Sequence, residues 1–265
     1  MHPLLFQLGP IPIHTYGFLI AIGFLVAVNV IKRLATRSNL DVERVLDLTF
    51  WSLVLGFLGA RILFIITRFS AFMADPISMF KVWEGGLVFF GGPLLVVPFA
   101  VWYVKKHGMS PWKVVDVIMP GLAIAHVFGR FGCLAAGCCY GRPTGTNFGV
   151  RLYSDLVEKH LQGIPLHPTQ LYEASALFIL FWGLLWVFKH KKFDGQVGLT
   201  YFMAYPLIRS VVEIYRGDEI RGFVIDGILS TSQFISILVF VAAAIFLKIR
   251  LNQIHHTGQH AGARA

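Results

Sequence analysis

The chain of 265 residues is 56% hydrophobic and only 14% charged. Because a soluble domain carries about 25% charged residues, this composition excludes an ordinary soluble protein and indicates one embedded in a membrane. The net charge of +9 does not predict a nucleic-acid partner, since Lys and Arg stand in short clusters at the ends of apolar runs, as they do around membrane-spanning helices.

Apolar runs that could cross a bilayer as helices recur along the chain, each needing about 20 residues. The first run has no basic segment before it and no small-residue cleavage site after it, so it is not interpreted as a signal peptide. The predicted fold class is an all-α polytopic membrane protein with about seven transmembrane helices and a small extracytoplasmic cap. The spans are expected near residues 15–33, 46–67, 86–105, 113–134, 170–188, 196–214 and 227–249.

The loops between these spans differ in positive charge. Those on one side hold 13 Lys and Arg residues, counting the C-terminal segment, and those on the other side hold 7. Because the richer side faces the cytoplasm, we expect an N-terminus outside and a C-terminus in the cytoplasm.

The chain is expected to form a single integral membrane domain over residues 1–250. The longest stretch outside the spans, about residues 141–169, has the Gly, Pro and Asn content of turns, and its NFGVRLY could form a short strand. We expect the extracytoplasmic cap there. Residues 251–265 are polar and are predicted to be a disordered cytoplasmic tail. Its histidines could bind metal, but a solvated tail is the favoured interpretation.

Two of the predicted spans carry ionisable residues along one helical face. Such groups are costly at membrane depth and usually face a cavity or a partner. The aligned residues are His126, Arg130 and Cys133 in HVFGRFGC, and Tyr205, Arg209, Glu213 and Arg216 in YPLIRSVVEIYR. With the predicted orientation, both faces lie toward the outer half of the membrane.

Further polar residues are expected at the same level. Tyr16 stands at the outer end of the first span, and HPTQLYE brings His167, Gln170 and Glu173 to the start of the fifth. Arg61, inside the second span, cannot be placed in depth from the sequence, and we expect it to pair with a carboxylate or with carbonyl groups.

The intramembrane arginines have two interpretations. One is an ion pair that fixes helix packing, which the i, i+4 spacing of Arg209 and Glu213 favours. The other is a phosphate site. Arg130 has no carboxylate within four residues on its own helix and is flanked by Gly129 and Gly132. Since a guanidinium can grip a phosphate through two hydrogen bonds, two arginines in the outer half point to a phospholipid headgroup.

The three cysteines, Cys133, Cys138 and Cys139, leave three interpretations open. A zinc site usually shows CxxC-type spacing, and a redox site favours CxxC; Cys-x4-Cys-Cys matches neither. A free cysteine in apolar surroundings behaves as a small hydrophobic residue, which is the favoured interpretation. No metal and no cofactor are expected.

Three blocks of the sequence resemble the prolipoprotein diacylglyceryl transferase family: GRFGCLAAGCCYG, HPTQLYE and YPLIRSVVEIYRGDE. HTYGFLIAIGF, GARILF, WEGGLVFFGG and DGILSTSQ also follow the family's order, so the resemblance covers about residues 5–245. It implies an enzyme of the bacterial inner membrane that moves the sn-1,2-diacylglyceryl group from phosphatidylglycerol to the thiol of a prolipoprotein's lipobox cysteine, releasing glycerol 1-phosphate. Its implied partners are phosphatidylglycerol, the prolipoprotein signal peptide and membrane lipids.

The resemblance also assigns residues. Arg130 matches the arginine that the family uses on the phosphatidylglycerol headgroup. Tyr16, Tyr205, Arg209 and Glu213 match positions important in the family, and Gly141 matches the glycine that closes its signature. Substrate contacts are further expected from His167, Gln170, Glu173 and Arg61. The chain departs from the family at Cys133, where many members have Asn, at Cys138, where many have Glu, and at Phe90, where many have a histidine proposed as base.

Together these observations favour Arg130 and Arg209 as the groups that meet the charge of a departing phosphate. His126, Glu213 and the leaving phosphate all remain candidates for accepting the thiol proton. Three other classes remain as alternatives: an anion transporter or channel, a membrane redox or metal protein, and a structural subunit. The first would be favoured by internal repeats, of which the sequence shows none, and the second by bound metal.

Overall fold

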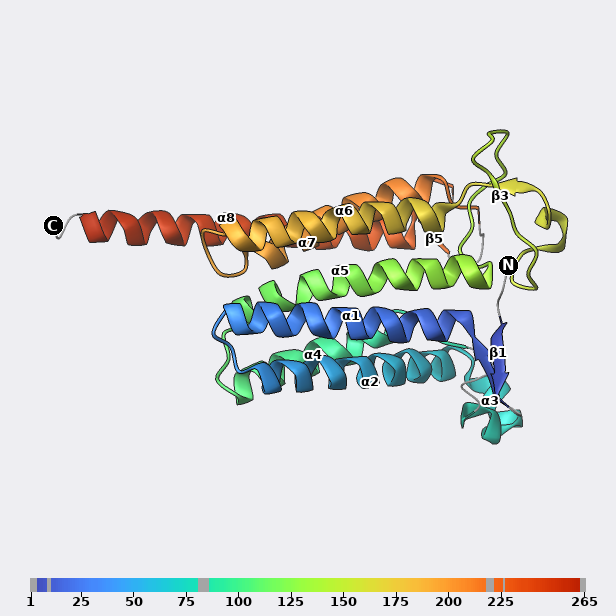
Figure 1. Ribbon diagram of the computed structural model, residues 1–265, viewed down its shortest axis with the longest axis horizontal. Coiled ribbons are helices and arrows are strands. Elements are labelled where there is room, and N and C mark those ends of the chain that lie inside the picture. The colour runs from blue at the N-terminus through green and yellow to red at the C-terminus, as the bar shows by residue number, and fades with distance from the viewer. Residues whose placement is uncertain (1–3, 9–10, 81–85, 218–221, 226, 263–265) are drawn as a thin grey trace. The chain divides into compact units, whose positions relative to one another are not determined.

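The computed structural model describes residues 4–8, 11–80, 86–217, 222–225 and 227–262 (Figure 1). The helices are α1 (Thr15–Arg37), α2 (Val42–Thr67), α3 (Phe69–Ala74), α4 (Gly91–Lys106), α5 (Pro111–Ala136), α6 (Thr169–His190), α7 (Gln196–Ile214) and α8 (Thr231–Gly262), with short 3-10 helices η1 (Pro76–Phe80) and η3 (Lys159–Leu161). The strands form three antiparallel pairs, β1 (Leu4–Leu8) with β2 (Ile11–His14), β3 (Val150–Arg151) with β4 (Pro165–Leu166), and β5 (Phe223–Ile225) with β6 (Leu229–Ser230).

Six of these helices, α1, α2, α5, α6, α7 and α8, are long and apolar enough to cross a membrane. They confirm the predicted all-α polytopic membrane protein and six of the expected spans. The span predicted at 86–105 is instead the helix α4, which has 16 residues. At 1.5 Å per residue it is about 24 Å long, shorter than the ~30 Å hydrocarbon core, because the helix begins only at Gly91.

The chain divides into two compact units, residues 31–118 and residues 1–30 with 119–265. In the first unit, α4 packs against α2. The contact is close because glycines meet there: a Cβ on Gly59 would lie 2.2 Å from the carbonyl oxygen of Gly91. The Gly-Gly step that opens α4 therefore serves close helix packing.

The second unit holds the larger hydrophobic core. Apolar side chains from α5, α6 and α7, together with Ala27 of α1, bury one another around Ala123, Leu177 and Leu184, which are fully excluded from solvent. Helix α6 packs on α7, and α7 on α8 (Figure 1). The polar faces of α5 and α7 are thus carried by one packed group of helices.

The segment after α5 forms a small folded layer rather than a loose loop. Strands β3 and β4 pair within it, and Tyr140, Leu152, Val157, Leu161 and Leu166 make a buried cluster of their own. The strand predicted in NFGVRLY is present only over Val150–Arg151.

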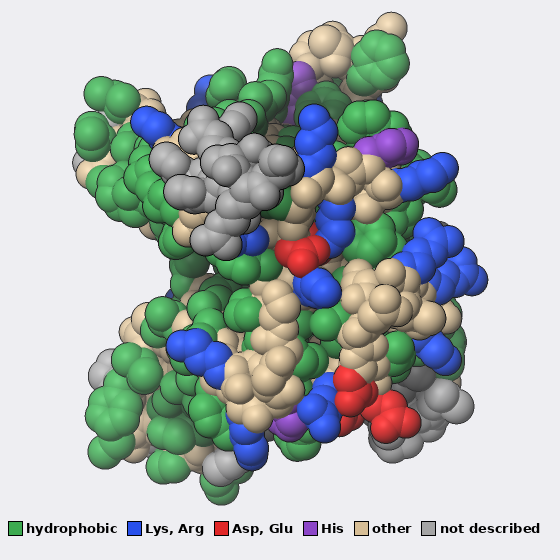
Figure 2. Space-filling view, turned by 90° about the vertical axis from the view of Figure 1, so that its left-hand side faces the viewer, with side chains coloured by type: hydrophobic (Ala, Val, Ile, Leu, Met, Phe, Trp, Pro, Cys, Tyr) green, Lys and Arg blue, Asp and Glu red, His purple; other side chains and the backbone are tan. Residues whose placement is uncertain are grey.

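The basic residues that predict orientation lie at helix ends. Arg37 stands in the last turn of α1, Lys105 and Lys106 in that of α4, and Lys189 in that of α6. Figure 2 views the helix ends at which α6 finishes and α7 starts, and Lys and Arg side chains are prominent there among apolar ones.

Helix α8 continues through Gly262. The assignment of residues 251–265 to a disordered cytoplasmic tail stays a prediction. A helix propagates at low cost once its apolar part has nucleated it, and the polar tail extends α8 in this way. Residues 263–265 lie outside the described residues.

Candidate active site

Glu173 is the centre of the polar cluster in the second unit. It lies near the start of α6, and its side chain is only 1% exposed. Arg130 on α5 donates from Nη2 to its Oε1 atom at 2.9 Å. The Tyr205 hydroxyl on α7 donates to the same oxygen at 3.2 Å. Three helices therefore converge on one carboxylate that is removed from solvent.

Arg209 lies between two carboxylates. Its Nη2 atom is 2.5 Å from Oε2 of Glu213, one turn further along α7, so the pair predicted from the i, i+4 spacing is present. Its Nη1 atom is 3.6 Å from Oε2 of Glu173. Arg209 also donates from Nη2 to the Ser232 hydroxyl at 3.1 Å, which ties α7 to the start of α8.

Arg130 has a carboxylate partner that its own helix does not supply. No carboxylate follows it on α5 within hydrogen-bonding range, but α6 supplies Glu173 from elsewhere in the chain. Sequence spacing reports only partners on the same helix, and this partner is tertiary. Formally, the two arginines are balanced by the two carboxylates of Glu173 and Glu213.

Each arginine nevertheless keeps hydrogen-bonding capacity. Within the described residues, Arg130 Nε, Arg209 Nη1 and Glu173 Oε2 are buried and have no hydrogen-bond partner. Buried polar atoms are almost always satisfied in folded proteins, and an exception needs an explanation such as a missing ligand. Arg130 and Arg209 both lie at Glu173, and each has one buried nitrogen without a hydrogen-bond acceptor among the described residues. Two such donors suit an anion with several oxygens.

His126 lies beside this cluster without bonding tightly to it. Its Nε2 atom is 3.7 Å from Oε1 of Glu173, beyond hydrogen-bonding distance, and its ring centre is 5.3 Å from that of Tyr205. The His126 side chain is 25% exposed, more than Arg130 at 13% and Arg209 at 12%. It is therefore more accessible than the arginines and carboxylates of the cluster.

Gly141 and the loop before it are fixed by backbone contacts. Its N–H donates to the His167 carbonyl at 2.9 Å. A Cβ at this position would lie 2.6 Å from the Tyr215 carbonyl oxygen and 2.6 Å from the His167 Cβ. Only glycine fits here, so the geometry explains Gly141 by packing; the substrate contact predicted for it stays a prediction.

Gln170 and His167, the other two residues predicted in HPTQLYE, also make contacts that stabilise the fold. The Gln170 amide donates to the carbonyl of Cys138 at 2.7 Å and is 1% exposed. The His167 Nδ1 atom lies 3.1 Å from the Tyr172 hydroxyl, and its ring packs 5.3 Å from that of Tyr215. Both side chains anchor the loop between α5 and α6 onto the start of α6.

Tyr16 of α1 packs against the last turns of α5, and the cysteines lie in those turns and just after them. The Tyr16 ring occupies the space that a side chain at position 132 would need, 2.8 Å from an ideal Cβ on Gly132. All three cysteines are free thiols. The Cys138 thiol donates to the Cys133 carbonyl at 3.7 Å. Interaction with the neighbouring Cys133 and Cys138 side chains lowers the pKa of Cys139, and the charges of Arg216 and Arg130 act in the same direction.

Arg61 belongs to the other unit. It is buried and donates from Nε to the Met79 carbonyl at 3.1 Å and from Nη1 to the Gly86 carbonyl at 3.0 Å. Its guanidinium also lies 5.5 Å from the Phe64 ring centre. Of the two partners expected for Arg61, these contacts are with carbonyl groups. Phe90 precedes α4 in this same unit and is 42% exposed.

The sequence does not indicate two residues of the cluster, Ser232 and Tyr201, or the central position of Glu173. Ser232 lies in DGILSTSQ, which the sequence singles out only by the family's order of blocks. Tyr201 lies one turn before Tyr205 on the same face of α7, and the two rings stack with their centres 5.6 Å apart. Glu173 was expected at a substrate contact, but nothing in its local sequence indicates that two arginines share it.

The fold and this cluster define the class: a multi-pass membrane protein with a buried site of two arginines, two carboxylates and a tyrosine. Residues 3–249 match the family described as prolipoprotein diacylglyceryl transferase, and the chain belongs to this family.

Curated relatives agree over nearly their whole length. The chain is 33% identical over 263 residues to phosphatidylglycerol–prolipoprotein diacylglyceryl transferase 2 of Clostridium perfringens, covering 98% of this chain and 100% of that protein. It is 33% identical to the phosphatidylglycerol–prolipoprotein diacylglyceryl transferase of Clostridium tetani, covering 94% and 98%. The protein of the same name in Vibrio atlanticus is 31% identical, with 92% and 89% covered.

Proposed function

We propose that this protein transfers the sn-1,2-diacylglyceryl group of phosphatidylglycerol to the lipobox cysteine thiol of prolipoproteins and releases glycerol 1-phosphate. Its family membership supports the reaction class. The observation that carries the proposal within the molecule is the pair of arginines on Glu173, each with a buried N–H group that lacks a hydrogen-bond partner among the described residues. A phosphate diester offers the oxygen acceptors that these groups lack.

The reaction exchanges one bond at an sp3 carbon. The substrate's sulfur forms the new C–S bond, the C–O bond to phosphate breaks, and its electron pair stays on the phosphate oxygen. Arg130 and Arg209 meet the charge that grows on that oxygen. Prepositioned donors of this kind act most strongly in a site shielded from water, where one is worth about 3–4 kcal/mol. The ion pairs with Glu173 and Glu213 hold both guanidinium groups in place before the substrate arrives.

The thiol must lose its proton, since thiolate is the nucleophile and a free thiol has a pKa of about 8.5. We assign this proton to His126. Glu213 is already engaged by Arg209 at 2.5 Å and is 8% exposed, whereas His126 is 25% exposed and has its Nε2 3.7 Å from Glu173. Glu173 would stabilise the imidazolium that forms. Tyr16, whose ring packs at Gly132 beside Arg130, is proposed to line the substrate's path.

The site is proposed to act in the outer leaflet of a bacterial inner membrane, with the N-terminus periplasmic and the C-terminus cytoplasmic. Along the single helix α5, Arg130 lies 17 residues beyond Lys113, which is about 26 Å at 1.5 Å per residue. If the Lys-rich loops face the cytoplasm, the arginine stands near the opposite surface, which is the side that secreted prolipoproteins reach. The folded layer between α5 and α6 is then the extracytoplasmic cap.

The test uses purified protein in detergent with phosphatidylglycerol and a lipobox peptide carrying one cysteine. Glycerol 1-phosphate release and the mass of the peptide are followed together. Wild type is expected to form the thioether peptide, and Arg130→Ala to lose about 100-fold to 1,000-fold in kcat. Arg33→Ala, which changes an exposed arginine outside the site, is the matched control and is expected to leave kcat unchanged.

A further variant separates the enzyme's thiols from the substrate's. Since the reacting sulfur comes from the peptide, exchange of Cys133, Cys138 and Cys139 together for Ala is expected to keep the activity. A folded wild-type protein that released no glycerol phosphate would overturn the proposed reaction. Full activity in Arg130→Ala would overturn the assigned role of the arginines.

A further inference from the structure

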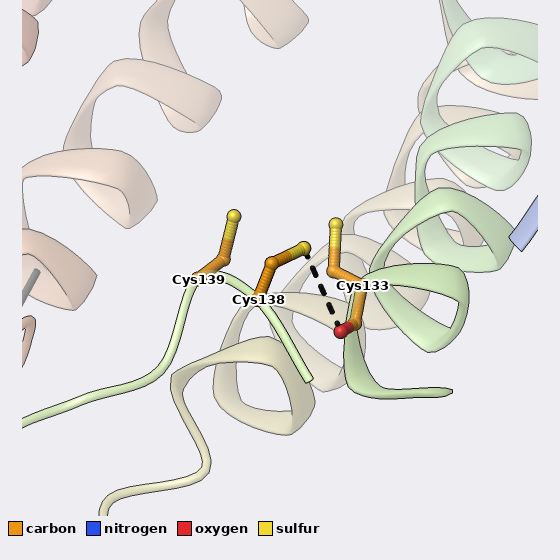
Figure 3. A group of neighbouring side chains, drawn as sticks. All are labelled: Cys133, Cys138 and Cys139. Carbon is orange, nitrogen blue, oxygen red and sulfur yellow. Dashed lines mark hydrogen bonds between the residues drawn. The ribbon is translucent and has the colours of Figure 1, made fainter. Parts of the chain in front are cut away.

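The three cysteine side chains come together at the end of α5, despite a spacing that predicts no metal site. Cys133 lies in the last turns of the helix. The backbone then turns at Gly137, with φ of 77°, and again at Cys139, with φ of 62°. The Cys138 N–H bonds back to the Cys133 carbonyl at 3.1 Å. As a result the three Sγ atoms all lie within 4.8 Å of one another, on the same side of the turn (Figure 3).

The turn is held in part from outside, although the Cys138 thiol also donates to the Cys133 carbonyl at 3.7 Å (Figure 3). The Thr169 hydroxyl donates to the Cys139 carbonyl at 2.7 Å, and the Gln170 amide donates to the Cys138 carbonyl at 2.7 Å. Both donors are 1% exposed and belong to the start of α6. A positive φ at Cys139 is uncommon for a residue other than glycine, yet the sequence places a thiol there. The backbone therefore presents all three sulfur atoms before any ligand binds.

The spacing of the sulfur atoms fits a metal ion at their centre. With metal–sulfur bonds of about 2.3 Å, three sulfurs around one ion in a plane lie about 4.0 Å apart. The upper limit of 4.8 Å in this cluster is therefore within a small side-chain adjustment of that geometry. In the described part of the chain, this is the one group of three or more His, Cys, Asp or Glu side chains that are close enough to share an ion.

We propose that Cys133, Cys138 and Cys139 form a binding site for one soft, three-coordinate cation, for which Cu(I) is the best match. Thiolate ligands select Cu(I), zinc and iron–sulfur clusters over hard cations. A structural zinc site has four protein ligands, and a zinc ion held by three of them completes its coordination with water; no fourth His, Cys, Asp or Glu of the described residues joins this group, as a three-coordinate ion requires.

The test is a competition for Cu(I) under anaerobic, reducing conditions, with the full-length protein in detergent and a chromophoric Cu(I) chelator. Wild type is expected to retain about one Cu(I) per chain, and its copper X-ray absorption is expected to show sulfur ligands only, three in number. The matched control is the triple variant Cys133→Ala, Cys138→Ala and Cys139→Ala, which is expected to lose this copper. It keeps His255, His256 and His260 of the C-terminal segment, so it reports any copper that these bind.

A second measurement needs no variant and so does not depend on the folding of one. Cu(I)-loaded and metal-free wild-type protein are treated with iodoacetamide, and each cysteine is followed by mass spectrometry. Loading is expected to slow the alkylation of all three thiols together, because a metal-bound thiolate is no longer free to react. Equal alkylation rates, nitrogen ligands at the copper, or a preference for Zn(II) over Cu(I) in the same competition would overturn the proposal. None of these outcomes bears on the transferase activity, which is measured with phosphatidylglycerol and peptide.

Discussion

Arg130 and Glu173, far apart in the sequence, form a 2.9 Å ion pair in which the carboxylate is almost completely buried. The same carboxylate also lies 3.6 Å from Arg209 and accepts a hydrogen bond from Tyr205. Breaking a buried ion pair by removing one partner is costly, because it leaves an uncompensated charge. Glu173 thus interacts with both arginines and holds their guanidinium groups in the site.

Glu173→Gln is expected to destabilise the protein and to abolish the proposed transferase activity. The neutral amide keeps the side-chain volume but leaves two cations facing each other in a buried site, which costs about 3–5 kcal/mol. The measurement is thermal unfolding in detergent together with glycerol 1-phosphate release. Glu43→Gln, on an exposed carboxylate in the first turn of α2, should change neither. A Glu173→Gln protein as stable as wild type would show that the arginines do not need this carboxylate.

His126→Gln is expected to lower kcat by about 100-fold or more, as loss of a general base does, while the protein stays folded. Its partial exposure and the absence of a hydrogen bond to Glu173 indicate that little packing depends on the imidazole. Glu213→Gln tests the rival base. If His126→Gln keeps most of its activity and Glu213→Gln does not, the proton goes to Glu213 and the assignment to His126 is wrong; if both keep it, the leaving phosphate accepts the proton.

Tyr205→Phe should have a small effect that depends on Glu173. The substitution removes a 3.2 Å hydrogen bond to the carboxylate but keeps the ring that stacks on Tyr201. Loss of one such bond costs about 0.5–1.5 kcal/mol. The unfolding free energies of Tyr205→Phe, Glu173→Gln and the double variant close a thermodynamic cycle, and their effects are expected to be non-additive. Additive effects would mean that the hydroxyl stabilises the site independently of Glu173.

Gly141→Ala is expected to destabilise the layer between α5 and α6 by about 1–3 kcal/mol, as overpacking of a tight site does. The new methyl group would lie 2.6 Å from the Tyr215 carbonyl oxygen, and backbone atoms cannot move aside easily. Gly145→Ala, in the same loop with nothing within 4 Å of its Cβ, is the matched control. Limited proteolysis of the loop and thermal unfolding measure the difference, and equal behaviour of the two variants would rule out the packing explanation.

Arg61→Lys is expected to lower the melting temperature while the activity per folded molecule remains. Arg61 donates from two different nitrogens to the Met79 and Gly86 carbonyls, and a lysine ammonium cannot reproduce this planar fork. Arg68→Lys, an exposed arginine beyond the same helix, controls for the loss of the guanidinium itself. A stable Arg61→Lys protein with reduced kcat would instead support the substrate contact that the sequence suggested for Arg61.

The positions of the helices along the chain could be predicted well from the sequence, because each helix corresponds to a local pattern of residues. Runs of apolar residues, bounded by Lys and Arg, correspond to α1, α2, α5, α6, α7 and α8. The span predicted at 86–105 is too long, because composition does not reveal where a Gly-rich segment becomes helical. Helix α4 begins only at Gly91. Local spacing also sufficed for Arg209 and Glu213, since one helix carries both.

The sequence by itself determined a multi-pass helical membrane protein, its family and the helical faces that carry His126, Arg130, Tyr205 and Arg209, because periodicity and ordered motifs are properties of the chain. Only the tertiary structure decided that Glu173 joins the two arginines and that the three thiols meet. Both depend on helices and turns packing together from distant parts of the chain: α6 supplies Glu173, and it also holds the turn that carries Cys138 and Cys139. Spacing along one helix contains no information about such a partner.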